Sequence, residues 1–134
     1  MTRSSTHRRF FSEKGQTVAE FALVLPILAA LLFAILEFGV AFNQYLTLTD
    51  AVRVGARKAA VSRLESDRCG PVKTAMLNNR GSLDPDKLSI PCPTSTWAGG
   101  DEVTVSASYP YSINVLWIVV KSGTMTSTAK ERVE

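Results

Sequence analysis

The sequence predicts an α+β protein, in which a long N-terminal helix precedes a small antiparallel β-rich domain that contains one short helix. Residues 21–42 are apolar with a single ionisable side chain, that of Glu37. Residues 43–66 contain no proline, and their apolar residues recur at three- and four-residue steps, as on one face of a helix. Residues 101–110 alternate between apolar and polar side chains, which is typical of a strand with one buried face.

Residues 1–15 are predicted to form a cytoplasmic leader. Four of them are Lys or Arg against one Glu, whereas eleven basic and eleven acidic residues balance over the rest of the chain. Positive charge directly before an apolar span predicts a cytoplasmic N-terminus. No clustered basic surface is left to bind nucleic acid. The only histidine, His7, lies in this leader and is interpreted as a solvated residue.

Residues 16–42 are predicted to form a transmembrane helix, so membrane lipid is an expected partner. A helix over residues 21–42 would span roughly 33 Å, which matches a hydrocarbon core of about 30 Å. The alternatives are a buried helix of a soluble protein and a secretory signal. A signal has an apolar region of about 7–15 residues followed by a small-residue cleavage site, and this run is longer and lacks such a site.

Two residues of the span are unusual for a membrane helix. Pro26 removes the hydrogen bond to the carbonyl of Ala22, so it is either a hinge or a tolerated membrane proline, and neither interpretation is preferred. Glu37 lies near the outer end of the span. We expect it to be hydrated at the membrane interface, the alternative being contact with a partner helix.

Residues 43–66 are expected to continue the same helix as an amphipathic stalk. One helix over residues 17–66 would reach roughly 75 Å. Ala51, Gly55 and Ala59 form a ridge of small residues at four-residue steps. Gly55 costs about 1 kcal/mol relative to alanine in a helix interior, which close approach of a neighbouring backbone would offset. The sequence leaves open whether that neighbour belongs to this chain or to another subunit.

Residues 67–134 are predicted to form a small α+β domain outside the membrane. Gly70-Pro71 should end the stalk, and residues 71–80 read as a short helix with Pro71 at its first position and Gly81 after its end. Residues 86–92 are a candidate short strand that ends at a proline.

The remaining elements are predicted to be β-strands. Residues 101–110 should bury alternate side chains, namely Val103, Val105, Ala107 and Tyr109. Residues 123–134 are Thr-rich and are expected to close the sheet antiparallel to residues 102–109. The apolar residues 111–120 are too few for a second membrane crossing. They fit a core strand, a short helix or an exposed hydrophobic patch.

The two cysteines, Cys69 and Cys92, both follow the predicted span. With a cytoplasmic N-terminus they would lie in an oxidising exterior such as a periplasm. We therefore predict a disulfide, which should stabilise the domain by about 3 kcal/mol by closing a loop of about 24 residues. The alternative is two unrelated buried thiols.

Catalytic, cofactor-binding and metal-binding patterns are missing from the sequence, so an enzyme is not expected. Two cysteines separated by 23 positions do not form a Cys-x-x-Cys motif, and no glycine-rich phosphate loop occurs. The acidic residues of the domain lack EF-hand spacing and are interpreted as solvated loop residues rather than a calcium site. These residues are Asp84, Asp86, Asp101 and Glu102.

The head of the apolar run resembles the type IV prepilin processing motif. Lys14 and Gly15 end the leader, and Glu20 is the fifth residue counted from Gln16. By this resemblance a prepilin peptidase would cut after Gly15 and free the amine of Gln16. The resemblance also implies that Glu20 pairs with the N-terminal amine of an adjacent subunit and sets the register between subunits. Pairing reduces the penalty of burying both charges in lipid.

The wider sequence resembles the TadE family of minor pilins, or pseudopilins, of the tight-adherence (Flp pilus) system. The resemblance rests on "VAEFA", "LP" and "EFG" within residues 18–39, on "DAVR" and "GAR" within residues 50–57, and on the C-terminal "VTVSASYPYS" and "TSTAKERVE". It implies a pilin-like fold, a single span in the inner membrane and a periplasmic C-terminal domain. The implied partners are a prepilin peptidase, a major Flp-type pilin, a second minor pilin and the inner-membrane assembly platform.

The leading hypothesis is therefore a membrane-anchored minor pilin that takes part in initiating or assembling a pilus, and incorporation into the pilus is compatible with this role. The alternative is a single-span, membrane-anchored periplasmic binding module that never polymerises. The two hypotheses differ in whether the Gly15–Gln16 bond is cut.

Overall fold

The fold was analysed in a computed structural model that describes residues 13–94, 97–115 and 118–134. Its elements are α1 (Glu13–Val61), α2 (Cys69–Asn78), β1 (Glu102–Val115) and β2 (Ile118–Arg132). The predicted α+β class is confirmed. Most of the predicted leader, residues 1–12, lies outside the described residues.

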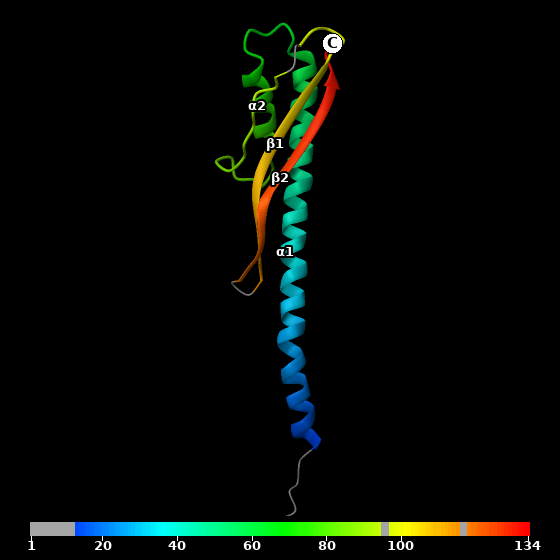
Figure 1. Ribbon diagram of the computed structural model, residues 1–134, viewed down its shortest axis with the longest axis vertical. Coiled ribbons are helices and arrows are strands. Elements are labelled where there is room, and N and C mark those ends of the chain that lie inside the picture. Colours follow the sequence, from blue (N-terminus) through cyan, green and yellow to red (C-terminus); the bar gives the residue numbers. More distant parts are fainter. Residues whose placement is uncertain (1–12, 95–96, 116–117) are drawn as a thin grey trace, which may run out of the picture.

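Helix α1 is the axis of the molecule (Figure 1). Its 49 residues correspond to a length of roughly 73 Å. Among the residues described, it is the one helix long and apolar enough to cross a membrane, and none of its most apolar window is buried inside the molecule. The N-terminal half of α1 therefore stands free of the rest of the chain, while the C-terminal half carries the folded domain.

The helix ends at Val61, five residues before the end that the sequence predicted. The reason lies in Ser62, whose buried hydroxyl donates a 2.7 Å hydrogen bond to the carbonyl of Lys58. The backbone N–H of Ser62 instead reaches Ala59, three residues back, at 3.1 Å. A 2.9 Å ion pair between Lys58 and Glu65 then holds the chain in a turn. Side-chain competition for the last carbonyls thus stops the helix without proline or glycine.

Helix α2 begins two residues before its predicted start at Pro71. The carboxylate of Asp67 accepts hydrogen bonds from the backbone N–H groups of Cys69 and Gly70, both at 3.0 Å. These are orphan donors of the first turn, so an acidic residue before the helix satisfies them and complements the helix dipole. Pro71 therefore lies inside the first turn rather than at its start.

The strand predicted for residues 86–92 is wrong, because it is reduced to one isolated bridge. Ser89 exchanges two 2.9 Å backbone hydrogen bonds with Ser108 of β1. Pro91 has no N–H to donate, and a turn in which the N–H of Lys87 reaches the carbonyl of Asp84 precedes the bridge. Pairing cannot extend in either direction from Ser89.

Strands β1 and β2 form a two-stranded antiparallel hairpin, with Glu102 opposite Arg132 and Tyr109 opposite Met125. The predicted pairing of residues 102–109 with the C-terminal segment is therefore confirmed. The predicted inward face is also confirmed, since Val103, Val105, Ala107 and Tyr109 are all buried.

The apolar stretch 111–120 extends this hairpin, although residues 116–117 lie outside the described residues. Residues 111–115 complete β1, and residues 118–120 begin β2. Ile118, Val119 and Val120 are exposed by 69%, 60% and 64%. The sequence allowed a core strand, a short helix or an exposed hydrophobic patch. The described residues of this stretch form strands, and residues 118–120 form an exposed hydrophobic patch.

One core joins the three layers. Both α2 and the hairpin pack on the C-terminal half of α1, side by side (Figure 1). The buried residues of this core are Leu48, Val52, Ala56 and Ala59 of α1, Val72 and Met76 of α2, Val103, Val105, Ala107 and Tyr109 of β1, and Leu83, Leu88, Trp97 and Val133 of the connecting and terminal segments. The amphipathic part of α1 and residues 67–134 therefore share one hydrophobic core.

Gly55 lies where the three layers meet. A Cβ atom at this position would stand 2.5 Å from Cγ of Met76 and 3.5 Å from Cγ1 of Val105. Ala51 and Ala59, one turn away on either side, are also fully buried. The neighbour of this small-residue ridge is thus in the same chain, and it consists of α2 and β1.

We expect Gly55→Leu to lower the free energy of unfolding by about 2 kcal/mol, because the new side chain has no space between Met76 and Val105. Gly39→Leu is the matched control, since no atom lies within 4 Å of a Cβ atom there. Thermal unfolding of the full chain in detergent, followed by near-ultraviolet circular dichroism, measures both. Equal midpoints for the two variants would contradict the packing role of Gly55.

Candidate functional site

The head of α1 is the candidate site for processing and subunit pairing. Residues 15–20 occupy the first turns of the helix, and all six are exposed. They lie at the far end of α1 from the folded domain (Figure 1). The structure therefore presents this segment freely, with no part of the domain packed over it.

The fold does not require a glycine at position 15. Nothing in the described part of the chain lies within 4 Å of a Cβ atom placed there, and the residue lies in a helix, where glycine is unfavourable relative to alanine. The described contacts therefore give no packing reason for a glycine at this position.

Glu20 accepts a hydrogen bond from the side-chain amide of Gln16 at 3.1 Å, one helical turn away. This contact is exposed, and the amide of Gln16 is neutral, so it does not compensate the negative charge of the carboxylate. A carboxylate this close to a long apolar segment is stabilised far better by a cation than by an amide. The two residues that the sequence assigned to processing and register are thus neighbours on one face of α1.

The helix continues without interruption through Pro26. Because proline has no N–H, the carbonyl of Ala22 still lacks its usual helical donor. A continuous helix is compatible with both interpretations of Pro26, so the hinge stays a prediction.

Glu37 is half-buried, and it lies one position before an open cleft between α1 and the hairpin. This cleft has a volume of about 280 Å³. It is lined by Phe38, Ala41 and Phe42 of α1, Tyr111 and Ile113 of β1, and Lys121 and Met125 of β2. The sequence analysis missed this cleft. The signal that could have found it is the alternation of β1, which continues past Tyr109 and carries the hairpin back along the apolar span.

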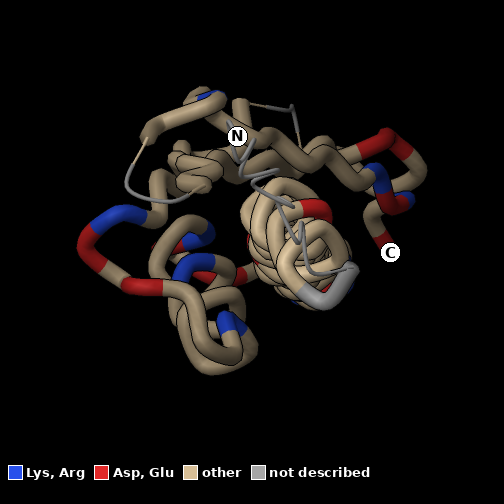
Figure 2. Tube along the Cα trace, turned by 90° about the horizontal axis from the view of Figure 1, so that it is seen from below, with Lys and Arg blue, Asp and Glu red and all other residues tan. Residues whose placement is uncertain are grey.

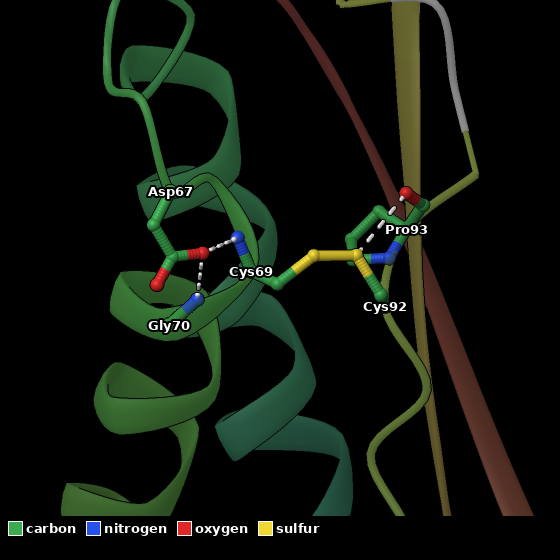
Figure 3. Close-up of a disulfide and its surroundings, with 5 residues drawn as sticks. All are labelled: Asp67, Cys69, Gly70, Cys92 and Pro93. Carbon is green, nitrogen blue, oxygen red and sulfur yellow. Dashed lines mark hydrogen bonds between the residues drawn. A yellow bond between two sulfur atoms is a disulfide. The ribbon is translucent and has the colours of Figure 1, made fainter.

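The disulfide ties α2 to the segment that leads into the hairpin. Cys69 and Cys92 are bonded, with their Cα atoms 5.5 Å apart. Figure 3 shows the bridge beside the Asp67 carboxylate that caps the first turn of α2. The bridge and the cap hold the same turn, one through a covalent bond and the other through two hydrogen bonds.

Charged side chains are distributed without a dominant sign. Figure 2, which looks along the molecule from the N-terminal side of α1, shows basic and acidic residues interspersed around the folded end. Asp84 pairs with Lys87 at 3.5 Å, and Glu102 pairs with Lys130 at 3.7 Å. Within residues 13–94, 97–115 and 118–134, no three His, Cys, Asp or Glu side chains are grouped so as to hold a metal ion.

We expect Cys69→Ser combined with Cys92→Ser to lower the free energy of unfolding by about 3 kcal/mol, because the unfolded chain regains the entropy of a loop of about 24 residues. Urea unfolding of the full chain in detergent measures the change. The wild type treated with reductant should match the double variant. A wild type whose thiols react fully with maleimide before reduction would contradict the bridge.

Comparison with known proteins is informative for α1. Residues 15–57 match the model of the family described as TadE-like protein. The match covers about a third of the chain, and it includes Gly15, Gln16, Glu20, Pro26 and Gly55. No curated protein and no solved structure matches the chain. The resemblance to the TadE family is confirmed over this segment.

Proposed function

Because α1 carries a TadE-like segment from Gly15 to Arg57, we propose that this chain is a membrane-anchored minor pilin that takes part in initiating or assembling a Tad pilus. The family match, which indicates a pilus-associated membrane protein, is the observation that carries the proposal. The free, apolar N-terminal half of α1 supports it, since this half has no protein partner within the described chain.

The proposal assigns an orientation. The excess basic charge before Gly15 supports a cytoplasmic N-terminus by the positive-inside rule. The folded domain then lies on the opposite side of the inner membrane, in the periplasm, where the Cys69–Cys92 bridge is stable.

The mechanism follows from Glu20 and from the position of Gly15. In the uncut chain the nitrogen of Gln16 belongs to a peptide bond and carries no charge. Cleavage after Gly15 converts it into an ammonium group at the membrane surface. That ammonium group is the cation that the Glu20 carboxylate of a neighbouring subunit lacks, and pairing the two charges offsets much of their desolvation. Cleavage thereby turns an anchored monomer into a subunit able to pair.

Gly15→Ala should block cleavage without disturbing the fold, because no atom of the described residues lies within 4 Å of a Cβ atom at position 15. Intact-mass spectrometry of the full chain co-expressed with a prepilin peptidase is the measurement. Wild type should lose residues 1–15 and begin at Gln16, whereas Gly15→Ala should keep its full mass. Gly39→Ala, an equally uncrowded glycine of α1, should be cut like the wild type.

An uncut wild-type chain in the presence of an active peptidase would refute processing. That outcome would favour the non-polymerising binding module, which needs only the anchor and the domain.

Glu20→Ala should insert normally and be cut normally, yet fail to enter filaments. Removing one partner of a buried ion pair costs about 3–5 kcal/mol, so incorporation should fall by more than about a hundredfold. Immunoblotting of sheared filaments against the membrane fraction measures this ratio. Glu37→Ala, which removes the other carboxylate of the apolar run, is the matched control and should incorporate. Unchanged incorporation of Glu20→Ala would remove Glu20 from the mechanism.

A further inference from the structure

The end of the hairpin exposes apolar side chains on both of its faces. Ile118, Val119 and Val120 are consecutive and all more than half exposed. Ile118 and Val119 pair regularly with Val115 and Asn114, before the bulge at Val120, so their side chains point to opposite faces. A single protein surface laid against one face would therefore leave the other uncovered. An apolar medium that surrounds the hairpin would cover the exposed side chains of both faces at once. Residues 118–120 are called the hairpin tip below.

The register of the hairpin brings this tip beside the apolar part of α1. Along β1, Val105 lies against Gly55, and Ile113 lies across the cleft from Phe38 and Phe42, so the strand runs toward the N-terminal end of α1. Residues 114 and 115 complete β1, and β2 begins at Ile118, which pairs with Val115. Val115 is two residues past Ile113 and lies opposite Ile118, so at about 3.3 Å per residue the start of β2 lies roughly 7 Å beyond the level of Ile113. Figure 1 shows the tip alongside the middle of α1.

The surface of α1 at that level is itself apolar and exposed. Leu31, Leu32, Ile35 and Leu36 are between 57% and 69% exposed. The tip and this part of α1 are at the same height along the helix, so one medium must cover both. For a helix that crosses a membrane, that medium is lipid.

The depth of the tip is limited by its backbone. A two-stranded hairpin has two open edges, and unpaired N–H and C=O groups do not occur facing lipid within the hydrocarbon region. About 20 helical residues suffice to cross that region. We place the hydrocarbon crossing at Thr17 to Leu36, the first 20 residues after Gln16 in the predicted span 16–42, so that residues 37–42 lie in the headgroup region. Glu37 is then at the outer boundary, and the tip is close to that boundary. Apolar side chains buried roughly 5–10 Å at the boundary between headgroups and acyl chains are typical of interfacial segments.

Lys121 completes the arrangement. It is exposed, follows the tip directly, and lines the cleft at the level of Phe38, Ala41 and Phe42. This level lies just outside the proposed hydrocarbon boundary, which is the height of the lipid phosphates. A lysine there keeps its stem against apolar atoms and its ammonium group among the headgroups.

We infer that the hairpin tip docks into the outer leaflet of the same membrane that α1 crosses. In this arrangement Ile118–Val120 contact acyl chains, and Lys121 contacts phospholipid phosphate. The domain thus has a second attachment to the membrane, which holds it at a fixed height and orientation around α1. The inference rests on the membrane anchoring of the proposed function and is independent of the pilin role.

The test measures the depth of three labelled positions in the full chain. Val119→Cys, Leu32→Cys and Thr128→Cys each add one thiol for a fluorescent label, while the native cysteines stay protected in their disulfide. The proteins are reconstituted in phosphatidylethanolamine–phosphatidylglycerol vesicles that contain phospholipids brominated near the headgroup or deep in the chain. The label at Val119 should be quenched at least about twofold more by the shallow quencher than by the deep one. The label at Thr128, an exposed position at the opposite end of β2, should be quenched by neither.

The label at Leu32 reports whether α1 lies in the membrane, independently of the hairpin tip. If the label at Leu32 is strongly quenched while the label at Val119 is as unquenched as that at Thr128, the insertion of the hairpin tip is contradicted and the membrane crossing by α1 is retained. Absence of quenching at Leu32 would overturn both. Two Val119→Cys chains that cross-link, with quenching lost as the protein density rises, would show that the tip contacts a second copy of the chain. That result would contradict the contact with lipid.

Lys121→Glu tests the charge contact without changing the apolar tip. In vesicles rich in phosphatidylglycerol it should shift the Val119 label outward and reduce its shallow quenching, because a carboxylate is repelled by anionic headgroups. Lys130→Glu on the same strand, far from the tip, is the matched control. An unaltered Val119 signal in Lys121→Glu would overturn the assignment of Lys121 to lipid phosphate.

Discussion

At Gly55 the backbone of α1 approaches Met76 of α2 and Val105 of β1 more closely than a larger side chain at that position would permit. Both remaining layers of the domain meet the helix at this point, so their height along α1 is set there. The positions of the hairpin and of the cleft along α1 depend on that height. The reach of the hairpin, the level of the cleft and the distance between the domain and Glu20 would all change if the layers moved by one helical turn, about 5.4 Å.

The same helix therefore operates in two environments. Residues from Leu48 onward bury their apolar face in protein, whereas residues before Glu37 expose apolar side chains in every direction. The two carboxylates in the apolar half, those of Glu20 and Glu37, have different surroundings. Glu37 is half-buried next to the cleft, and we propose that it lies at the height of water and headgroups. Glu20 has only the amide of Gln16 within the described chain, which is why we assign it to a partner outside the subunit.

Much of the fold could be predicted because its signals are local. The apolar run, the alternation from Val103 to Tyr109 and the pairing with the C-terminal segment each follow from a repeating pattern. The end of α1 could not be predicted, since it depends on the orientation of the Ser62 hydroxyl. Residues 111–120 were ambiguous because an apolar residue has the same appearance in sequence whether protein or lipid covers it. The roles predicted for Gly15 and Gln16 in processing and for Glu20 in subunit register rest on spacing in the sequence, whereas the cleft depends on tertiary register.

The buried position of Val133 has a consequence for how the protein is made. Val133 belongs to the core, and the next backbone N–H, that of Glu134, donates to the carbonyl of Ala60 at 3.1 Å. A nascent chain that has emerged only as far as residue 117 has one strand of the hairpin and an open core. In the orientation that we propose, the domain would therefore cross the membrane before its core can close. The position of β2 after the rest of the fold would then make export precede folding.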